Sequence, residues 1–170
     1  MNPIARIPLP PGMLGSLYAS GLPGSAAGVP VDRLPEELRA RAVDRVVCLC
    51  PDDELLDRSP AYYGCLARDE LGVAVDRLPV ADWALPAEPG AYLGLVRETA
   101  TRLRMGERVL VHCNGGCGRT GTFCCCVLVA LGASPEEAEI AFRAARRCGP
   151  ENDDQRRFVE LAAIRLGPGS

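Results

Sequence analysis

The stretch that decides the fold of this chain reads Val109-Leu110-Val111-His112-Cys113-Asn114-Gly115-Gly116-Cys117-Gly118-Arg119-Thr120-Gly121. Its unbroken apolar run, Val109 to Val111, favours a central strand that is covered on both faces. The glycine-rich segment after this run lets backbone N–H groups converge on one point. A helix that begins near Gly118 aims its positive end at the same point, so the stretch predicts a cradle for an anion, and phosphate in particular.

The cradle brings a nucleophile and a cation together. Cys113 is expected at the mouth of the ring of N–H groups, where the nearby helix N-terminus favours the thiolate over the thiol. Arg119 offers the planar, bidentate donors that phosphate oxygens need, and the chain contains no lysine. The alternative, that Cys113 is a packed core thiol, leaves the arginine and the glycines without a reason.

The remaining residues of the cradle are assigned supporting roles. The candidate phosphate-binding residues besides Arg119 are Asn114, Gly115, Gly116, Cys117 and Gly118. Thr120 can donate its hydroxyl to the Cys113 sulfur and ease its departure. His112, the only histidine, is expected to brace the loop by hydrogen bonding rather than to titrate.

Length and composition favour a single domain over residues 1–170, with an irregular segment at 1–12, because 48% of the residues are hydrophobic and 24% charged. A net charge of −3 argues against binding to nucleic acid or to a membrane surface. The prolines of the first thirty residues leave no signal-peptide core, and the longest apolar run, Phe123–Ala133, is too short to span a bilayer. We therefore expect a cytoplasmic protein, and the sequence leaves its oligomeric state open.

The nine cysteines are an odd number, and three of them, Cys124 to Cys126, are consecutive. We expect reduced thiols that mostly pack in the core. A zinc site is disfavoured, since there is no Cys-x-x-Cys pair and no second histidine.

Alternating strand and helix signals predict an α/β fold, with a short, mostly parallel central sheet flanked by helices. Strands are expected near 15–19 at an edge of the sheet, and at 43–50, 73–78 and 109–111. Helices are expected near 35–42, 59–71, 89–105, 118–131, 135–147 and 152–165. Ser134-Pro135-Glu136-Glu137 is typical of a capping box, and it marks one of these helix starts clearly.

The stretch from His112 to Gly121 matches the pattern His-Cys-x-x-Gly-x-x-Arg-Thr-Gly, and in this it resembles the cysteine-dependent protein tyrosine phosphatase superfamily. The cysteine and arginine alone would be a weak signal, since arsenate reductases and some rhodanese-like proteins share them; the flanking histidine, the central glycine and the trailing Thr-Gly make the match specific. The likeness covers most of the chain and is nearest to the dual-specificity type, the kinase-associated phosphatase family in particular. It rests further on Leu22-Pro23-Gly24, Cys50 with Glu54-Leu55, Leu78 to Asp82 and Ser134 to Ala138.

The resemblance implies the dual-specificity phosphatase fold and a two-step reaction without metal or cofactor. Cys113 would attack the phosphoester, an aspartate would protonate the leaving oxygen, and water would release the phosphate. Asp82 matches the general acid, since it lies on a loop bordered by prolines that can close over a substrate. The alternatives are an ordinary turn aspartate, or Asp76, which falls inside a predicted strand.

Two further sets of residues carry hypotheses of their own. In tyrosine-specific members of the superfamily a Gln-Thr-x-x-Gln segment positions water; here Gln155 matches the second glutamine, but Glu151 replaces the first. Helix capping by Asn152 and Gln155 is the favoured alternative.

Cys50 lies near the end of a predicted strand, and a disulfide with such a cysteine protects the nucleophile in some superfamily members. Cys117 is a second candidate partner.

The sequence thus predicts a phosphatase that acts on phosphotyrosine, and on phosphoserine or phosphothreonine, in phosphorylated protein partners. A non-protein substrate, either a phosphoinositide or an RNA 5′ phosphate, is the alternative within enzymes. A catalytically silent phosphate-binding module is the alternative outside them. The loop carries no lysine of the kind that meets the extra phosphates of lipid headgroups, and this favours the protein substrate.

Overall fold

The computed structural model describes residues 3–167 and centres on a five-stranded sheet of order β1-β2-β5-β3-β4. The strands are β1 (Ile4–Ile7), β2 (Ser16–Ser20), β3 (Arg45–Cys48), β4 (Ala74–Arg77) and β5 (Arg108–His112). Only the β1–β2 pair is antiparallel. The expected short, mostly parallel sheet flanked by helices is confirmed.

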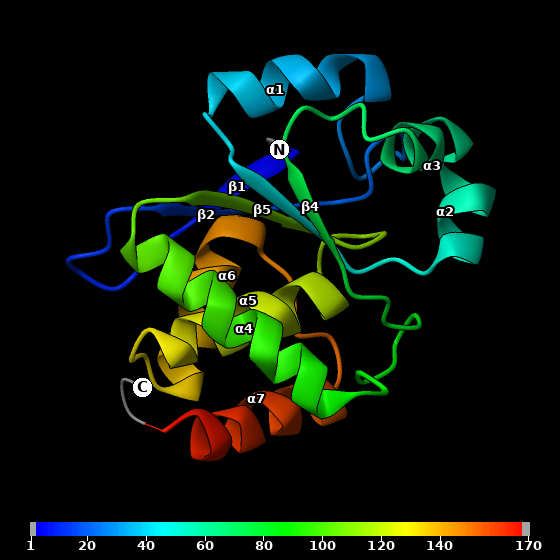
Figure 1. The fold of residues 1–170 in the computed structure, drawn as a ribbon. Coiled ribbons are helices and arrows are strands. Elements are labelled where there is room, and N and C mark those ends of the chain that lie inside the picture. The colour runs from blue at the N-terminus through cyan, green and yellow to red at the C-terminus, as the bar shows by residue number, and fades with distance from the viewer. Residues whose placement is uncertain (1–2, 168–170) are drawn as a thin grey trace.

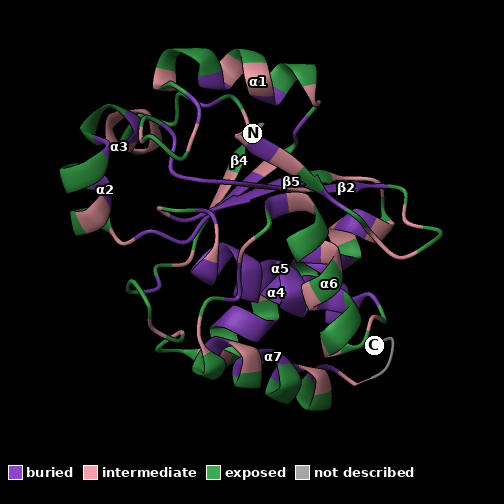
Figure 2. Cartoon of the chain, turned by 180° about the vertical axis from the view of Figure 1, so that it is seen from behind, coloured by how far each residue is buried: buried purple, intermediate pink, exposed green. Residues whose placement is uncertain are grey.

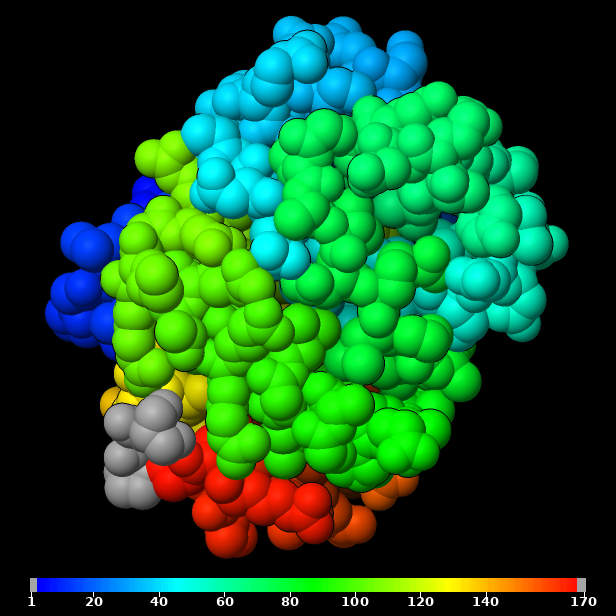
Figure 3. Space-filling view, viewed as in Figure 1, coloured from blue at the N-terminus to red at the C-terminus, as the bar shows by residue number. Residues whose placement is uncertain are grey.

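The helices form a layer on each side of the sheet (Figure 1). They are η1 (Val31–Arg33), α1 (Leu34–Ala40), α2 (Asp52–Arg58), α3 (Pro60–Ala67), α4 (Pro89–Arg104), α5 (Gly118–Ala130), α6 (Pro135–Arg146) and α7 (Asp153–Leu166). Helices α4 to α7 cover one face, and α1 covers the other, with α2 and α3 beyond β4. In the space-filling view α7 (red) lies directly beneath α4 (green) (Figure 3).

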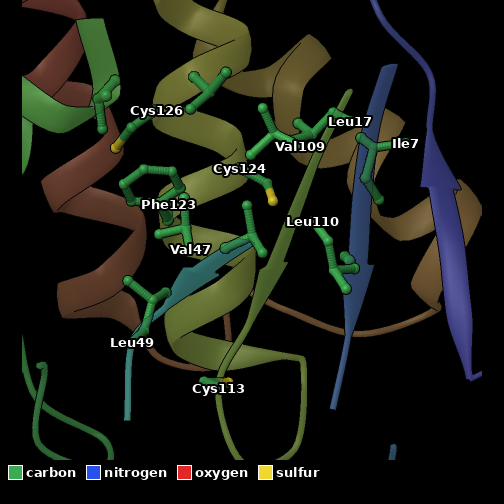
Figure 4. Packing of buried hydrophobic residues seen from close by; sticks show 14 of the residues in the cluster. Ile7, Leu17, Val47, Leu49, Val109, Leu110, Cys113, Phe123, Cys124 and Cys126 are labelled. Atoms are coloured by element: carbon green, nitrogen blue, oxygen red, sulfur yellow. The ribbon is translucent and has the colours of Figure 1, made fainter. Parts of the chain in front are cut away.

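The centre of the core is the contact between β5 and α5. Every residue of α5 from Gly118 to Ala130 is buried, which explains its apolar character on all sides. Figure 2 shows the resulting buried layer, and Figure 4 shows Phe123 and Cys124 of α5 facing Val47 and Val109 of the sheet.

The predicted N-terminal caps of α6 and α7 are confirmed. The Ser134 hydroxyl accepts from the Glu137 N–H and the Glu137 carboxylate accepts from the Ser134 N–H, which is the expected capping box. The Asn152 side chain caps α7 by accepting from the Gln155 N–H at 2.8 Å. Each such cap stabilises its helix by about 1 kcal/mol.

Two expectations near the N-terminus are wrong. Residues 4–7 form strand β1 instead of part of an irregular segment, and Ser16–Ser20 is therefore an inner strand rather than an edge strand. The prolines that suggested irregular structure border the strand without interrupting it. Ile4 and Ile7 are buried, so tertiary packing outweighs the local signal.

Helix α2 is absent from the predicted elements, because Pro51-Asp52-Asp53 reads as the end of a strand. Proline before acidic residues is also the pattern of a helix start, and Asp52, Asp53 and Glu54 form the first turn of α2. Helix α3 ends at Ala67, four residues earlier than expected. No described helix combines the length and apolar character needed to cross a membrane.

Candidate active site

The carboxyl ends of the central strands meet at one edge of the sheet, and the candidate site lies there. Residues Ser20 of β2 and Cys48 of β3 are both in register with His112, the last residue of β5. Ligands of open α/β sheets bind at this edge. Cys113 comes directly after His112 and starts the Cys113–Arg119 loop, which turns into α5 as expected (Figure 4).

The backbone of the Cys113–Arg119 loop folds around the cysteine sulfur. The Gly116 N–H donates to Cys113 Sγ at 3.3 Å. The first α5 hydrogen bond runs from the Gly121 N–H to the Cys117 carbonyl at 2.7 Å, so the N-terminus of α5 lies at the loop. The arrangement stabilises negative charge on the sulfur, or on an anion beside it.

Gly116 is required at its position for two reasons. Its φ of +72° lies in the left-handed region, and a β-carbon there would be 2.5 Å from both the Ser20 carbonyl oxygen and Arg146 Nη2. The chain therefore approaches β2 and α6 more closely than any side chain would permit.

Arg146, at the end of α6, holds the outside of the loop. Its guanidinium donates to the carbonyls of Gly115 and Gly116 at 3.2 and 3.3 Å, and to the carbonyl of Pro3 at 3.2 Å. It is nearly fully buried, and burial lowers its pKa. Since these carbonyls are bonded outward, the loop's N–H groups are left for the interior of the cradle.

Arg119 is held by the carboxylate of Glu54, a residue to which the sequence alone assigns no role. Its Nη1 and Nη2 donate to the two oxygens of Glu54 at 2.6 and 2.9 Å, and Nη1 also donates to the Val80 carbonyl at 2.9 Å. Burial opposes the charge of Arg119, but the hydrogen bonds to Glu54 and the charge of Cys113 outweigh burial and raise the pKa of the guanidinium.

From the sequence, Glu54 stands out only as one of the residues that the chain shares with a known family. A local signal exists, since it lies in an acidic helix start just after the end of β3, at the active edge of the sheet. What the sequence lacks is the pairing, because Glu54 and Arg119 are 65 residues apart.

Asp82 lies at the site and Asp76 does not. The Asp82 Oδ1 atom is 3.0 Å from Arg119 Nη2, and 58% of the Asp82 side chain is exposed. Asp76 is inside β4 and accepts from Arg45 Nη1 at 2.9 Å. The structure therefore brings the favoured of the two candidate acids to the cradle.

His112 and Thr120 flank the loop from inside the core. The fully buried His112 ring hydrogen-bonds through Nε2 to the Tyr62 hydroxyl at 2.8 Å, which ties β5 to α3. This contact fits the bracing role. Thr120 Oγ1 is buried and has no hydrogen-bond partner among residues 3–167.

The segment before α7 covers the start of α5. A β-carbon at Gly118 would lie 2.5 Å from Glu151 Oε2 and 3.1 Å from Gln155 Nε2. Gln155 is buried, and its Oε1 accepts from the Glu151 N–H at 2.8 Å. Asn152 therefore caps α7 and the Gln155 side chain binds the backbone just before the helix, in line with the favoured alternative, while Gln155 also lies against the loop.

The expectation that all nine cysteines are reduced is wrong for two of them. Cys117, in the loop, forms a disulfide with Cys148, which lies just after α6. Cys117 is therefore bonded to Cys148 and not available to Cys113. Both residues are partly exposed, and the α6–α7 turn brings them together.

The other seven cysteines are free, and Cys124 to Cys126 are fully buried as expected of packing residues. Cys50 is also buried. Its hydrogen bond to Cys48 and its burial raise the pKa of Cys50. Among residues 3–167, no group of three or more histidine, cysteine or acidic side chains is arranged to hold a metal ion.

The chain is similar to known proteins both in sequence and in structure. Residues 21–166 match the family model described as "PTP-SAK: Swiss Army Knife protein, DSP-PTPase phosphatase domain". Cyclin-dependent kinase inhibitor 3 of Rattus norvegicus is 29% identical over 117 residues, which are 67% of this chain and 54% of that protein. The matched part thus spans about half the length of this curated relative.

Two solved structures share the fold. One is kinase associated phosphatase with its catalytic cysteine replaced by serine, at a TM-score of 0.82 and 23% identity, covering 96% of this chain and 94% of that one. The other is Tk-PTP in the active form, at a TM-score of 0.70 and 29% identity, covering 91% and 98%.

Proposed function

The chain belongs to the family of dual-specificity-type protein tyrosine phosphatase domains, and from this we propose that it hydrolyses phosphotyrosine, and phosphoserine or phosphothreonine, in phosphorylated proteins. One observation carries the proposal. A nearly buried cysteine at the end of β5 accepts a backbone N–H, while Arg119 in the same loop contacts both Glu54 and Asp82. The residues proposed as nucleophile, phosphate-binding cation and proton donor therefore lie together at one edge of the sheet.

The first step transfers the phosphoryl group to the protein. Cys113 Sγ attacks phosphorus and forms the S–P bond, as the bond from phosphorus to the ester oxygen breaks. Asp82 gives its proton to that oxygen, which leaves as an alcohol or phenol. Arg119 and the loop N–H groups stabilise the charge on the three equatorial oxygens.

The second step releases phosphate. Water attacks phosphorus, its proton goes to Asp82, and the S–P bond breaks to return Cys113 as a thiolate. Thr120 can donate its hydroxyl to the departing sulfur, a role supported by the burial of Oγ1 without a hydrogen-bond partner in the described chain. The Gln155 amide, which lies against Gly118, is a candidate to orient the water.

The proposed substrate is a phosphoprotein rather than nucleic acid or lipid. The chain has a net charge of −3 and no lysine, and the exposed residues beside Glu54 and Gly118 include the acids Asp53 and Glu151. Such a surface repels polyanions more than it repels a single phosphorylated side chain.

The experiment measures phosphate release from a phosphotyrosine peptide and from phosphothreonine and phosphoinositide substrates. Cys113→Ser should bind the peptide without turnover, and Asp82→Asn should lose most activity toward poor leaving groups. Cys65→Ser is the matched control, because Cys65 is a free cysteine in α3, outside the site. Turnover by Cys113→Ser equal to that of the parent would exclude the mechanism, and a preference for the lipid would exclude the substrate.

We further propose a cytoplasmic location, since seven of the nine cysteines are free thiols, and there the partly exposed Cys117–Cys148 bond would be open to reduction. We also propose Cys50 as the partner that protects an oxidised Cys113. Peroxide would convert the Cys113 thiolate to a sulfenic acid, and the Cys50 thiol would displace water to form the disulfide. Peptide mapping after peroxide treatment tests this step. Finding Cys113 only as sulfinic or sulfonic acid would reject it, and fractionation of cells tests the location.

A further inference from the structure

Trp83 is an exposed aromatic residue directly beside the proposed general acid. It is the only tryptophan of the chain, and 63% of it is exposed. It lies on the loop between β4 and α4, together with the exposed Leu85. The mechanism proposed above gives neither side chain a role.

The backbone of Trp83 is held in an unfavourable conformation. Its φ of +59° lies in the left-handed region, which costs a bulky residue on the order of 1 kcal/mol. Such strain persists only where the surroundings impose it, and it gathers at functional sites. Glycine or asparagine would adopt this turn at lower cost, so the turn alone does not call for tryptophan.

Two hydrogen bonds impose the conformation and connect it to the site. The Trp83 N–H donates to Asp82 Oδ1 at 3.1 Å, and the Trp83 carbonyl accepts from Asn152 Nδ2 at 3.2 Å. The same Asp82 oxygen is 3.0 Å from Arg119 Nη2. One carboxylate oxygen therefore joins the Trp83 backbone to the residue that would hold the phosphate, so this exposed residue starts from the rim of the cradle.

A ring at this rim distinguishes among phosphoesters by the group attached to the ester oxygen. In phosphotyrosine this group is an aromatic ring, and a pair of aromatic rings is worth about 0.5–1.5 kcal/mol beyond burial. In phosphoserine and phosphothreonine it is a short aliphatic side chain, with no ring to pack against the indole. We propose that Trp83 is a specificity-determining residue that contacts the ring of phosphotyrosine; this rests on the proposed phosphatase function.

Binding can be followed by fluorescence, because Trp83 is the sole tryptophan and its emission reports on this residue alone. In a Cys113→Ser background, phenyl phosphate should change the emission and bind about 2- to 12-fold more tightly than methyl phosphate. Calorimetry on Trp83→Ala in the same background should find that preference abolished, and Trp83→Phe should retain most of it. Leu14→Ala is the matched control, since Leu14 is also a large exposed apolar residue and lies near Gly106, at the opposite edge of the sheet.

Turnover separates this inference from the function on which it rests. For peptides with identical flanks, Trp83→Ala should raise KM for the phosphotyrosine form about 2- to 12-fold and leave kcat/KM for the phosphothreonine form unchanged. An unchanged ratio between the two peptides, with hydrolysis intact, overturns the ring contact alone. Failure of the parent protein to hydrolyse either peptide overturns the proposed function.

Discussion

The carboxylate of Asp82 lies 3.0 Å from Nη2 of Arg119, the same guanidinium that is to bind phosphate. The same Nη2 also donates to one Glu54 oxygen, while Nη1 donates to the other and to the Val80 carbonyl. A phosphate dianion must therefore compete with Asp82 for this N–H group. We expect phosphate to take this bond and to leave Asp82 free to turn toward the ester oxygen, which it would protonate as the proposed acid.

This competition predicts opposite effects of Asp82→Asn on binding and on chemistry. Removal of the carboxylate charge should tighten binding of inorganic phosphate about 1.5- to 5-fold, the value of an exposed ion pair. Loss of the proton donor should lower kcat on a phosphotyrosine peptide about 10²- to 10⁴-fold. Calorimetry and steady-state kinetics check the two effects, and weaker phosphate binding by the variant would contradict the competition.

Glu54→Gln tests the bidentate contact with Arg119. The amide retains the shape but loses the charge, so the free energy of unfolding should fall by about 2 kcal/mol. Because Arg119 is then less well oriented, kcat/KM should fall up to about 100-fold. Denaturant unfolding and kinetics measure these effects. Glu70→Gln removes an equally bidentate but exposed contact to Arg68, and it should leave both quantities within experimental error.

Arg146→Met should loosen the cradle while preserving most of the buried volume. The carbonyls of Gly115 and Gly116 would lose their donors, and the Kd for inorganic phosphate should rise about tenfold, the equivalent of one hydrogen bond from a charged donor. Arg147→Met is the matched control, since Arg147 is adjacent and exposed. Identical phosphate affinity in the two variants would show that Arg146 does not support the loop.

Cys148→Ser removes the disulfide that joins the loop to the α6–α7 turn. Closure of this 31-residue separation is expected to stabilise the protein by about 3–4 kcal/mol. Cys148→Ser should therefore unfold at a lower denaturant concentration than the parent. Dithiothreitol should lower the unfolding midpoint of the parent but not that of the variant. Alkylation of all nine cysteines in denatured, unreduced protein would show that the bond is absent.

The free cysteines should differ sharply in reactivity. Burial raises the pKa of Cys125 to about 12 and raises the pKa values of Cys124 and Cys126 as well, so these three stay protonated at about pH 8. Iodoacetate is an anion that fits the cradle, and we expect it to label Cys113 first, with inorganic phosphate protecting. Mass spectrometry of brief labelling checks the order, and early labelling of Cys125 would contradict it.

Much of the site is predictable because it is local in sequence. Cys113 directly follows β5 and Arg119 is the second residue of α5, so the glycine conformation, helix dipole and thiolate chemistry all operate within one short strand–loop–helix segment. The same holds for the capping box at Ser134 and for the cap at Asn152. Asp82 is predictable from the likeness to a known family, and the strand pattern around Asp76 argues against that rival.

The amino-acid sequence alone determined the α/β class and the loop that carries Cys113, the proposed nucleophile, since each depends on patterns that span a few neighbouring residues. Only the tertiary structure decided which distant groups complete the cradle. Glu54 reaches Arg119, Arg146 reaches the loop carbonyls, and Cys148, out of nine cysteines, bonds to Cys117. Strand β1 likewise forms only against β2. The physical reason is that a buried charge or an unpaired backbone group can bond to any suitable partner that packing brings close. The partner lies far away in the sequence, so no local pattern identifies it.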